Sequence, residues 1–290
     1  MSTPVLSVLL PCRNGARTLA LALRSVLNQT FGDFELLLLN DGSTDDSVAI
    51  ANALDDPRIR ILGDGVGRGL PLRLNEGVTA ASGHYIARMD ADDVCFPQRF
   101  AQQVAFLDTH SEVDLVGCRA VVFRDCGEVV GLLPFAPDHA ALCAQPWRNI
   151  PLPHPSWMGR CDWFKAHPYR LPEVRRAEDQ ELLLRSYPDS HYACLDEVLL
   201  GYRQGPFQLQ RTLLARRELL TAQLGLFVQR GEWGNAARAT VLSSIKIVLD
   251  SLASLPGGDA LFFRRMSAPV SDAVKDALQQ SLVALDESPS

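Results

Sequence analysis

The segment MDADD at residues 89–93 places three carboxylates within four positions, directly after the stretch HYIAR. Like charges at this density repel one another unless water or a cation lies among them. A hard divalent cation prefers carboxylate oxygens, and magnesium or manganese often binds one or two of them together with substrate phosphates. Asp90 and Asp92 flank one small residue and suit that task. The other reading is a solvated loop in which Asp92 or Asp93 caps the next helix.

Two more polar clusters follow apolar runs earlier in the chain. They are PCRN at residues 11–14 and NDGSTD at residues 40–45. Asp, Gly, Ser and Thr together are typical of turns, and Ser43 or Thr44 is a candidate cap for the next helix. In the functional reading, Asp41 accepts a hydrogen bond from the edge of a nucleotide base. The cation of the acidic segment then bridges the diphosphate of that nucleotide.

The elements that must position these clusters alternate in type. Short continuous apolar runs are typical of strands buried on both faces, and we expect such strands at residues 5–11, 34–41, 58–62 and 84–90. Stretches with helical apolar spacing follow them at residues 18–29, 43–54, 69–81 and 96–110. This order predicts an α/β domain with a parallel sheet and right-handed crossovers. Ligands bind beyond the carboxyl ends of such strands, so the three polar clusters should face one crevice.

The rest of the chain has a different pattern. We expect strands of mixed direction within residues 114–160, a proline-rich rim over 134–156, a helix over 175–187 and a strand over 192–203. Residues 207–285 are helical in pattern, with breaks at 230–235 and 255–259. These breaks predict two or three helices appended to the α/β domain.

Composition excludes several classes of protein. The 290 residues are 47% hydrophobic, and a net charge of −6 without a basic run excludes a nucleic-acid polymer as partner. Seven scattered cysteines without a C-x-x-C pair argue against a disulfide framework or a zinc site and indicate reduced thiols in a cytoplasmic protein. We expect no signal peptide, because the start lacks a basic region. No apolar run reaches the ~18 residues of a membrane-spanning helix.

In their order and spacing, these motifs resemble those of the family 2 inverting glycosyltransferases, whose fold is called GT-A. The resemblance rests on the first strand with its PCRN, on NDGSTD, and on LNEGVTAASGHYIARMDADD. It implies a Rossmann-like, mostly parallel sheet flanked by helices, followed by a C-terminal helical appendage. The implied boundaries are a catalytic domain over residues 1–204, with a nucleotide-binding half (1–93) and an acceptor half (94–204), and a helical C-terminal region over 205–290.

The resemblance also assigns residues to the nucleotide-sugar donor. Those implied to contact the nucleotide or its phosphates are Pro11, Arg13, Asn14, Asp41, Arg68, Arg73, Asp90 and Arg203. Asp41 would meet a uracil ring, and Asn40 replaces an aspartate that the family commonly has before it. Arg68 and Arg73 have a plain alternative as solvated arginines on a helix. Gln204 stands where a histidine often follows the family's closing Tyr-Arg pair, so this part of the phosphate site would depend on Arg203 or on water.

Two further sets of acids correspond to family motifs. Asp90 and Asp92 match its Asp-x-Asp motif, with Asp92 as the expected direct ligand of Mn²⁺ or Mg²⁺. Glu178 and Asp179 match a Glu-Asp pair that opens a later helix, in which Asp179 is the expected general base. It would take the proton from an acceptor hydroxyl as that oxygen attacks the anomeric carbon, with inversion in one displacement. The alternative is a pair of first-turn acids that stabilise the helix dipole.

His154 matches a family histidine on the acceptor or metal side of the site. The alternative is an ordinary loop histidine without a role in the site.

We therefore expect a metal-dependent inverting glycosyltransferase that uses a nucleotide sugar, most simply a UDP-sugar. Its acceptor would be the hydroxyl of a surface glycan or of a lipid-linked precursor, in the cytoplasm. The alternative is a catalytically idle sugar-nucleotide-binding or assembly subunit, although such a chain should have lost the base or the metal acids. A nucleotidylyltransferase fits less well, because its phosphate loop is normally glycine-rich and PCRNGAR has one glycine.

The C-terminal region allows two kinds of interaction. Residues 240–255 are amphipathic, and ALFFRRM at residues 260–266 pairs aromatic side chains with arginines. These segments would rest peripherally on the inner face of a membrane that holds a lipid-linked acceptor. Alternatively they pack on the catalytic domain or form a homodimer. We favour packing.

Overall fold

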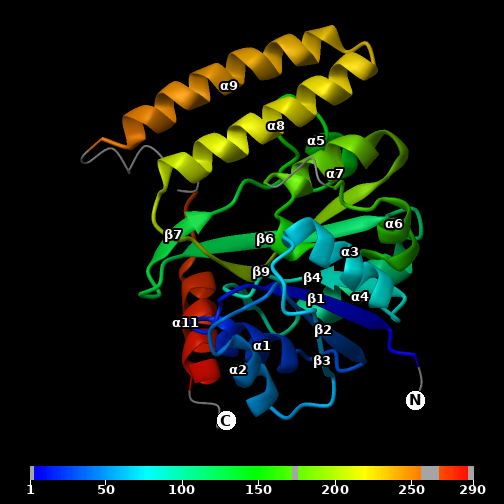
Figure 1. Ribbon diagram of the computed structural model, residues 1–290, viewed down its shortest axis with the longest axis vertical. Helices are drawn as coiled ribbons and strands as arrows, with labels where there is room; N and C mark the ends of the chain where they lie inside the picture. The colour runs from blue at the N-terminus through cyan, green and yellow to red at the C-terminus, as the bar shows by residue number, and fades with distance from the viewer. Residues whose placement is uncertain (1–2, 172–175, 256–267, 287–290) are drawn as a thin grey trace.

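The computed structural model describes residues 3–171, 176–255 and 268–286. Their strands form one nine-stranded sheet in the order β3-β2-β1-β4-β8-β6-β9-β5, with β7 paired to β6 (Figure 1). The strands are β1 (Leu6–Cys12), β2 (Phe34–Asn40), β3 (Ile59–Leu62), β4 (Tyr85–Arg88), β5 (Val94–Cys95), β6 (Leu115–Phe123), β7 (Val129–Leu132), β8 (Met158–Arg160) and β9 (Tyr192–Arg203).

Helices cover both faces of the sheet. They are α1 (Leu19–Leu27), α2 (Ser47–Ala53), α3 (Leu70–Ala80), α4 (Arg99–Thr109), α5 (His139–Leu142), α6 (Cys161–Ala166), α7 (Glu178–Ser186), α8 (Leu209–Gln229), α9 (Trp233–Ala253) and α11 (Asp272–Asp286). Val8 of β1 belongs to the apolar cluster that contains Leu23 of α1, whereas its neighbour Leu9 belongs to the cluster that contains Leu74 of α3. Successive strand residues point to opposite faces, so a strand covered on both sides is apolar along most of its length. Ser7 of β1 is a buried exception, and its hydroxyl donates to Glu35 of β2 at 2.7 Å.

The first half of the sheet is parallel, as predicted. β1 pairs in parallel with β2 and β4, and β3 pairs in parallel with β2. The second half is mixed in direction, also as expected: β8 is antiparallel to β4 and β6, while β9 is parallel to β6. The elements β8, β5 and α6 were not predicted separately, because they are only two to six residues long.

The short strand β5 fixes the end of the acidic segment. Val94 and Cys95 follow Asp93 directly and pair antiparallel with Gly201 and Leu200 of β9. The loop that carries the aspartates is therefore tied to the carboxyl end of β9, a strand more than 100 residues later in the chain.

The C-terminal helices separate into two groups, in contrast to a single appendage. α8 and α9 form an antiparallel hairpin at one end of the molecule, with the predicted break between them at Arg230–Glu232 (Figure 1). α11 lies at the other end against α1, where the carbonyl of Leu285 accepts a hydrogen bond from Arg24. The second predicted break, past residue 255, and the ALFFRRM segment lie outside the described residues. In the described ranges, no helix combines the length and the apolar character needed to cross a bilayer.

Candidate active site

The acidic segment forms a compact carboxylate cluster at the end of β4. Ligand oxygens of Asp90, Asp92 and Asp93 all lie within 4.8 Å of one another. Asp93 is buried, and its Oδ1 accepts a hydrogen bond of 2.7 Å from the backbone N–H of Arg203. Its Oδ2 is also buried but has no hydrogen-bond partner among the described residues. The cap of α4 is Gln98, so neither Asp92 nor Asp93 caps that helix.

Asp92 and Asp93 resist ionisation. Burial, and then the charges of Asp90 and Asp92, raise the pKa of Asp93 well above its usual range. Loss of hydration, and then the charge of Asp90, raise the pKa of Asp92 to about 6. A divalent cation would reverse both effects, because it favours the ionised form of each ligand. An unpartnered buried oxygen beside two more carboxylates is a donor set that suits Mg²⁺ or Mn²⁺.

Arg88 is the principal cation of this region, and its role was not predicted from the sequence. It is the last residue of β4, and its side chain is only 5% exposed. Its Nη1 lies 2.5 Å from Oδ2 of Asp90, and its charge opposes the raised pKa of Asp92, Asp93, Glu178 and Asp179. The available signal was an arginine within an otherwise buried strand, because an unpaired charge is rarely placed there.

A second acid pair opens α7. Ala177, just before it, has a left-handed backbone (φ 68°, ψ 27°), which is strained for a residue with a side chain. Burial, and then the charge of Asp179, raise the pKa of Glu178 to about 7, and burial raises the pKa of Asp179. Acids that only served the helix dipole would have lowered pKa values. The charge of Asp90 also contributes to the raised pKa of Glu178, so the two acid groups lie near each other.

His154 lies beside Glu178 of this acid pair and is 7% exposed. Its Nε2 is 2.8 Å from the hydroxyl of Tyr169, and its Nδ1 is 3.9 Å from Oε1 of Glu178. Burial, and then the charge of Arg88, hold the pKa of His154 well below its usual range, so the ring is neutral. Because the ring is buried and lies next to Glu178, it is better placed to support Glu178 than to contact a large acceptor.

The NDGSTD turn is built around Asp41, which is 6% exposed. Its Oδ1 accepts hydrogen bonds from the backbone N–H groups of Arg68 (2.6 Å) and Gly69 (3.0 Å), and it also accepts one from Nε of Arg73 (3.3 Å). Gly42 has φ 68°, and a Cβ there would lie 2.6 Å from the backbone nitrogen of Gly67. The close approach of these two loops therefore requires glycine.

The PCRN segment contacts the same turn. Asn14 has a left-handed backbone, and its Oδ1 accepts a hydrogen bond of 2.8 Å from the N–H of Thr44. Its own N–H donates to Oγ of Ser43 at 3.0 Å. Ser43 and Thr44 thus serve this loop, and α2 begins only at Ser47, four residues later than predicted. Arg13 is exposed, with Nη1 3.7 Å from Asp41, while Pro11 is buried at the end of β1.

Arg73 is a buried structural cation. It is 2% exposed and pairs with Asp41 (3.3 Å), Asp64 (2.5 Å) and Glu76 (2.7 Å). Arg68 is half-exposed and pairs with Asp64 at 2.6 Å. Neither arginine is a simple solvated residue on a helix.

We expect Arg73→Met to lower the free energy of unfolding by about 3 kcal/mol, because it removes the buried cation of Asp41 and leaves only the exposed and more distant Arg13. The matched variant Arg68→Met should cost under about 1 kcal/mol, because its ion pair is exposed to solvent. Urea unfolding followed by circular dichroism measures both. Equal losses for the two variants would contradict the buried role of Arg73.

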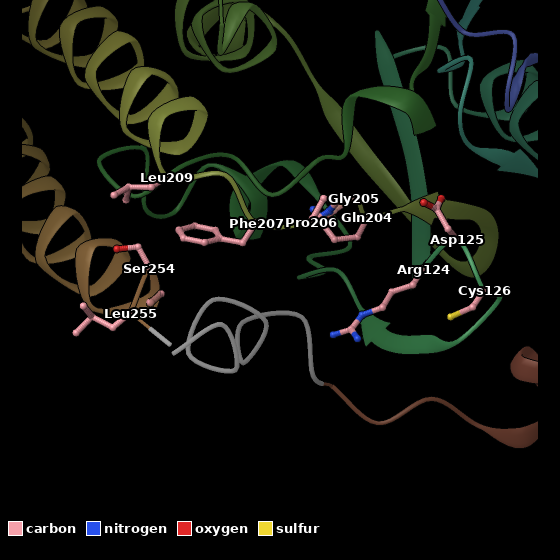
Figure 2. A pocket seen from close by; sticks show the side chains of 11 residues that line it. Arg124, Asp125, Cys126, Gln204, Gly205, Pro206, Phe207, Leu209, Ser254 and Leu255 are labelled. Carbon is pink, nitrogen blue, oxygen red and sulfur yellow. The ribbon is translucent and has the colours of Figure 1, made fainter. Parts of the chain in front are cut away.

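Arg203 joins the acidic segment to the β6–β7 turn. Its Nε donates to the carbonyl of Asp92 at 2.7 Å, and its Nη1 lies 3.2 Å from Oδ1 of Asp125. Asp125 also lines an open cavity of about 780 Å³ between this turn, residues 204–209 and the end of α9 (Figure 2). Gln204, which replaces the histidine common in the resembled family, lies in the wall of this cavity.

Comparison with known proteins identifies the relatives of this arrangement. The model of the family described as "Glycosyl transferase family 2" matches residues 7–167. EpsE of Bacillus subtilis (strain 168), which is named as a glycosyltransferase, is 34% identical to this chain. The match covers 70% of this chain and 74% of EpsE. The chain belongs to glycosyl transferase family 2. The O-antigen biosynthesis glycosyltransferase WbnJ of Escherichia coli is 27% identical over 78% of this chain and 90% of its own.

Solved structures agree with this family fold. S. aureus TarS residues 1–349 in complex with UDP-GlcNAc has a TM-score of 0.59 and 17% identity, over 97% of this chain and 80% of that one. Glucosyl-3-phosphoglycerate synthase from Mycobacterium tuberculosis, with Mn²⁺, UDP and phosphoglyceric acid, has a TM-score of 0.55 and 20% identity, over 77% and 78%. This chain spans 44% of a longer TarS chain. These similarities establish the GT-A fold, and the family membership makes the protein a glycosyltransferase.

Proposed function

We propose that this family 2 enzyme transfers a sugar from a UDP-sugar to a hydroxyl acceptor, with a divalent cation and with inversion. The observation that carries the proposal is the meeting of two acid groups, Asp90–Asp93 and Glu178–Asp179, around the buried Arg88. One group suits a metal-bound diphosphate, and the other suits the abstraction of a proton. The structures of TarS with UDP-GlcNAc and of the mycobacterial synthase with Mn²⁺ and UDP support this choice of donor and metal.

Asp92 and Asp90 would hold the cation, with Asp93 behind them. When bound, the cation would neutralise the diphosphate as it leaves. The nucleotide would lie across the ends of β1 and β2, against Pro11, Arg13 and Asn14. Asp41 would face the base, and the loop of Arg68 and Arg73 that now bonds to Asp41 would form its wall. Arg203 would hold the acidic segment in place on the phosphate side.

Asp179 is the better candidate for the general base. It retains partial exposure, whereas Glu178 is buried against His154. The base must come within hydrogen-bond reach of the acceptor hydroxyl, so the more accessible carboxylate suits the task. Its raised pKa makes it a stronger base than an ordinary aspartate. Glu178 would then help to position the acceptor within the crevice.

The proposed setting is the cytoplasm, in the synthesis of a surface glycan or its lipid-linked precursor. WbnJ, which is named for O-antigen biosynthesis, supports this class of acceptor. We assign the catalytic domain to residues 1–204 and the helical region to 205–290. An idle assembly subunit would not need to keep both acid groups at raised pKa.

Calorimetric titration of UDP into the full chain tests the donor assignment. We expect saturable binding with Mn²⁺ present and at least about 10-fold weaker binding with a chelator, because the carboxylates repel a diphosphate unless a cation lies between them. GDP and dTDP serve as the matched competitors. Tighter binding of either, or equal UDP binding with and without the metal, would contradict the proposal.

A further inference from the structure

Arg88 has a hydrogen-bond donor that no described residue uses. It is one of three buried arginines in the described ranges, together with Arg73 and Arg99. Every side-chain nitrogen of Arg73 and of Arg99 donates to an oxygen or sulfur atom of the chain. By contrast, Nε of Arg88 is buried and has no hydrogen-bond partner among the described residues. Native proteins seldom leave a buried N–H group without an acceptor, so this one points to an oxygen supplied by a ligand.

The backbone of Arg88 is fixed on both sides. Its N–H donates to the carbonyl of Trp157 at 2.9 Å, and its carbonyl accepts a hydrogen bond of 2.8 Å from Nη2 of Arg99. The side chain therefore extends from a rigid element, as a substrate contact requires. An ion pair with Asp90 would need only the point charge of a lysine, whereas a guanidinium offers several N–H donors in a fixed plane. Asp90 alone thus does not account for an arginine at this position.

Arg88 lies between the two acid groups of the site. On one side its Nη1 is 2.5 Å from Oδ2 of Asp90. On the other side, the ring of Trp157 lies 4.5 Å from the ring of His154, whose Nδ1 is 3.9 Å from Oε1 of Glu178. The charge of Arg88 opposes the burial that raises the pKa of Glu178, so the guanidinium is close to that carboxyl group as well.

In the proposed reaction, the transferred sugar lies in this same space, and the inference rests on that proposed function. The anomeric carbon must lie between the leaving phosphate oxygen, on the side of Asp90 and Asp92, and the acceptor oxygen that loses its proton to Asp179. A side chain that borders both acid groups therefore borders the sugar ring.

The charges around this space indicate the kind of sugar. Arg88 is the cation shared by five carboxylates, those of Asp90, Asp92, Asp93, Glu178 and Asp179. A carboxylate on the sugar would add to this excess of negative charge, whereas a hydroxyl group accepts a hydrogen bond without that repulsion. We propose that Nε of Arg88 donates a hydrogen bond to a hydroxyl group of a neutral hexose in the donor, and that Arg88 thereby helps to determine which sugar is transferred.

Calorimetric titration of the full chain with Mn²⁺ tests this role. The ligands are UDP and whichever of UDP-glucose, UDP-galactose and UDP-N-acetylglucosamine wild type binds most tightly. Arg88→Lys should raise the Kd for that UDP-hexose about 10-fold or more, because one hydrogen bond from a charged donor is lost. Its Kd for UDP should change little, because lysine keeps the positive charge beside Asp90.

Arg119→Lys is the matched control. Arg119 also pairs with one aspartate, Asp196, and has a buried Nε without a described partner, but it lies on β6 and Asp196 belongs to neither acid group. This variant should bind both ligands as wild type does. Retained binding of UDP by Arg88→Lys shows that it is folded, and Arg88→Gln takes its place if it is not.

Removal of single hydroxyl groups from the donor gives a second measurement. Of the monodeoxy forms of the chosen UDP-hexose, at least one should bind wild type about 10-fold more weakly than the parent, and the same removal should have no effect in Arg88→Lys. A wild type that is insensitive to every removal would overturn the proposal. So would losses that are equal in wild type and in the variant, because the hydroxyl group would then contact another residue.

Equal losses of UDP and UDP-hexose in Arg88→Lys would also overturn the proposal, because Arg88 would then act only through Asp90. Tighter binding of UDP-glucuronate than of UDP-glucose by wild type would contradict the neutral sugar. A wild type that binds no UDP would overturn the donor assignment together with this role, which distinguishes that failure from the others.

Discussion

Asp179→Asn should lower kcat for sugar transfer by about 10³-fold, while the KM for the donor changes little. General-base catalysis contributes roughly 10²–10⁴-fold, and the amide cannot accept the proton of the acceptor hydroxyl. The donor binds to the other acid group, so its affinity should not depend on Asp179. Steady-state kinetics with a UDP-sugar donor and a range of simple acceptors measures both constants.

Glu178→Gln and Glu181→Gln are the controls for this result. Glu178 lies against His154, and we expect its loss to be smaller than that of Asp179. Glu181 lies three residues further along α7 and pairs with Arg185 at 2.9 Å and with Arg170 at 3.3 Å, so Glu181→Gln should keep nearly full kcat. A larger loss in Glu178→Gln than in Asp179→Asn would reverse the two roles.

The pH profile gives a readout that a purely structural role would not produce. Below its pKa the base is protonated and inactive, so kcat/KM should rise with pH. Because burial raises the pKa of both acids, and that of Glu178 to about 7, this rise should fall above the ordinary carboxyl range. The two acids titrate as a pair, so the profile reports their joint value. In Asp179→Asn the rise should be lost or displaced to lower pH, since Asp179 itself raises the pKa of Glu178.

The parallel half of the fold could be predicted because its signal is local. β1 is buried over all seven residues, and such a strand must be mostly apolar, with Ser7 tolerated because it bonds to Glu35. The start of α2 was wrong by four residues, because Ser43 and Thr44 bond to a loop 30 residues earlier. Contacts of that kind have no periodic signal. The short strands β5 and β8 exist only because longer strands elsewhere pair with them.

The residues of the candidate site likewise fall into those with a local sequence signal and those that depend on distant contacts. The density of aspartates at residues 90–93 indicated a cation site without any knowledge of the fold. An arginine within a buried strand was the one local signal for Arg88. Its partners could not be predicted, because its burial depends on residues about 70 positions later, such as Trp157, whose carbonyl accepts the backbone N–H of Arg88. The burial of Arg73 could not be predicted either, because an arginine on a helix is usually solvated. In the structure Asp41 and the loop of Asp64 enclose this one.

Asp92→Asn should weaken Mn²⁺-dependent binding of UDP by at least about 100-fold and yet stabilise the metal-free protein. The first effect follows because Asp92 is the expected direct ligand of the cation, and an amide oxygen carries no charge to hold it. The second follows because the folded state raises the pKa of Asp92 to about 6. A carboxylate with a raised pKa opposes folding when it is ionised. Asp92 is the most exposed residue of the cluster although its carboxyl is partly desolvated, so solvent screening should limit the gain to less than about 1 kcal/mol.

The pH dependence separates these two effects. The gain in stability should be present above pH 6 and should vanish as pH falls toward the ordinary carboxyl range, where Asp92 is protonated in both folded and unfolded chains. Thermal unfolding with chelator and with Mn²⁺, at pH 5 and pH 8, measures it. Mn²⁺ should raise the melting temperature of wild type at pH 8 but not that of Asp92→Asn.

Asp196→Asn, which removes an exposed carboxylate paired with Arg119, is the control and should behave as wild type. A metal-free Asp92→Asn that is less stable than wild type would show that the aspartate cluster is a structural feature held by its own hydrogen bonds, and the cation site would have to be sought elsewhere.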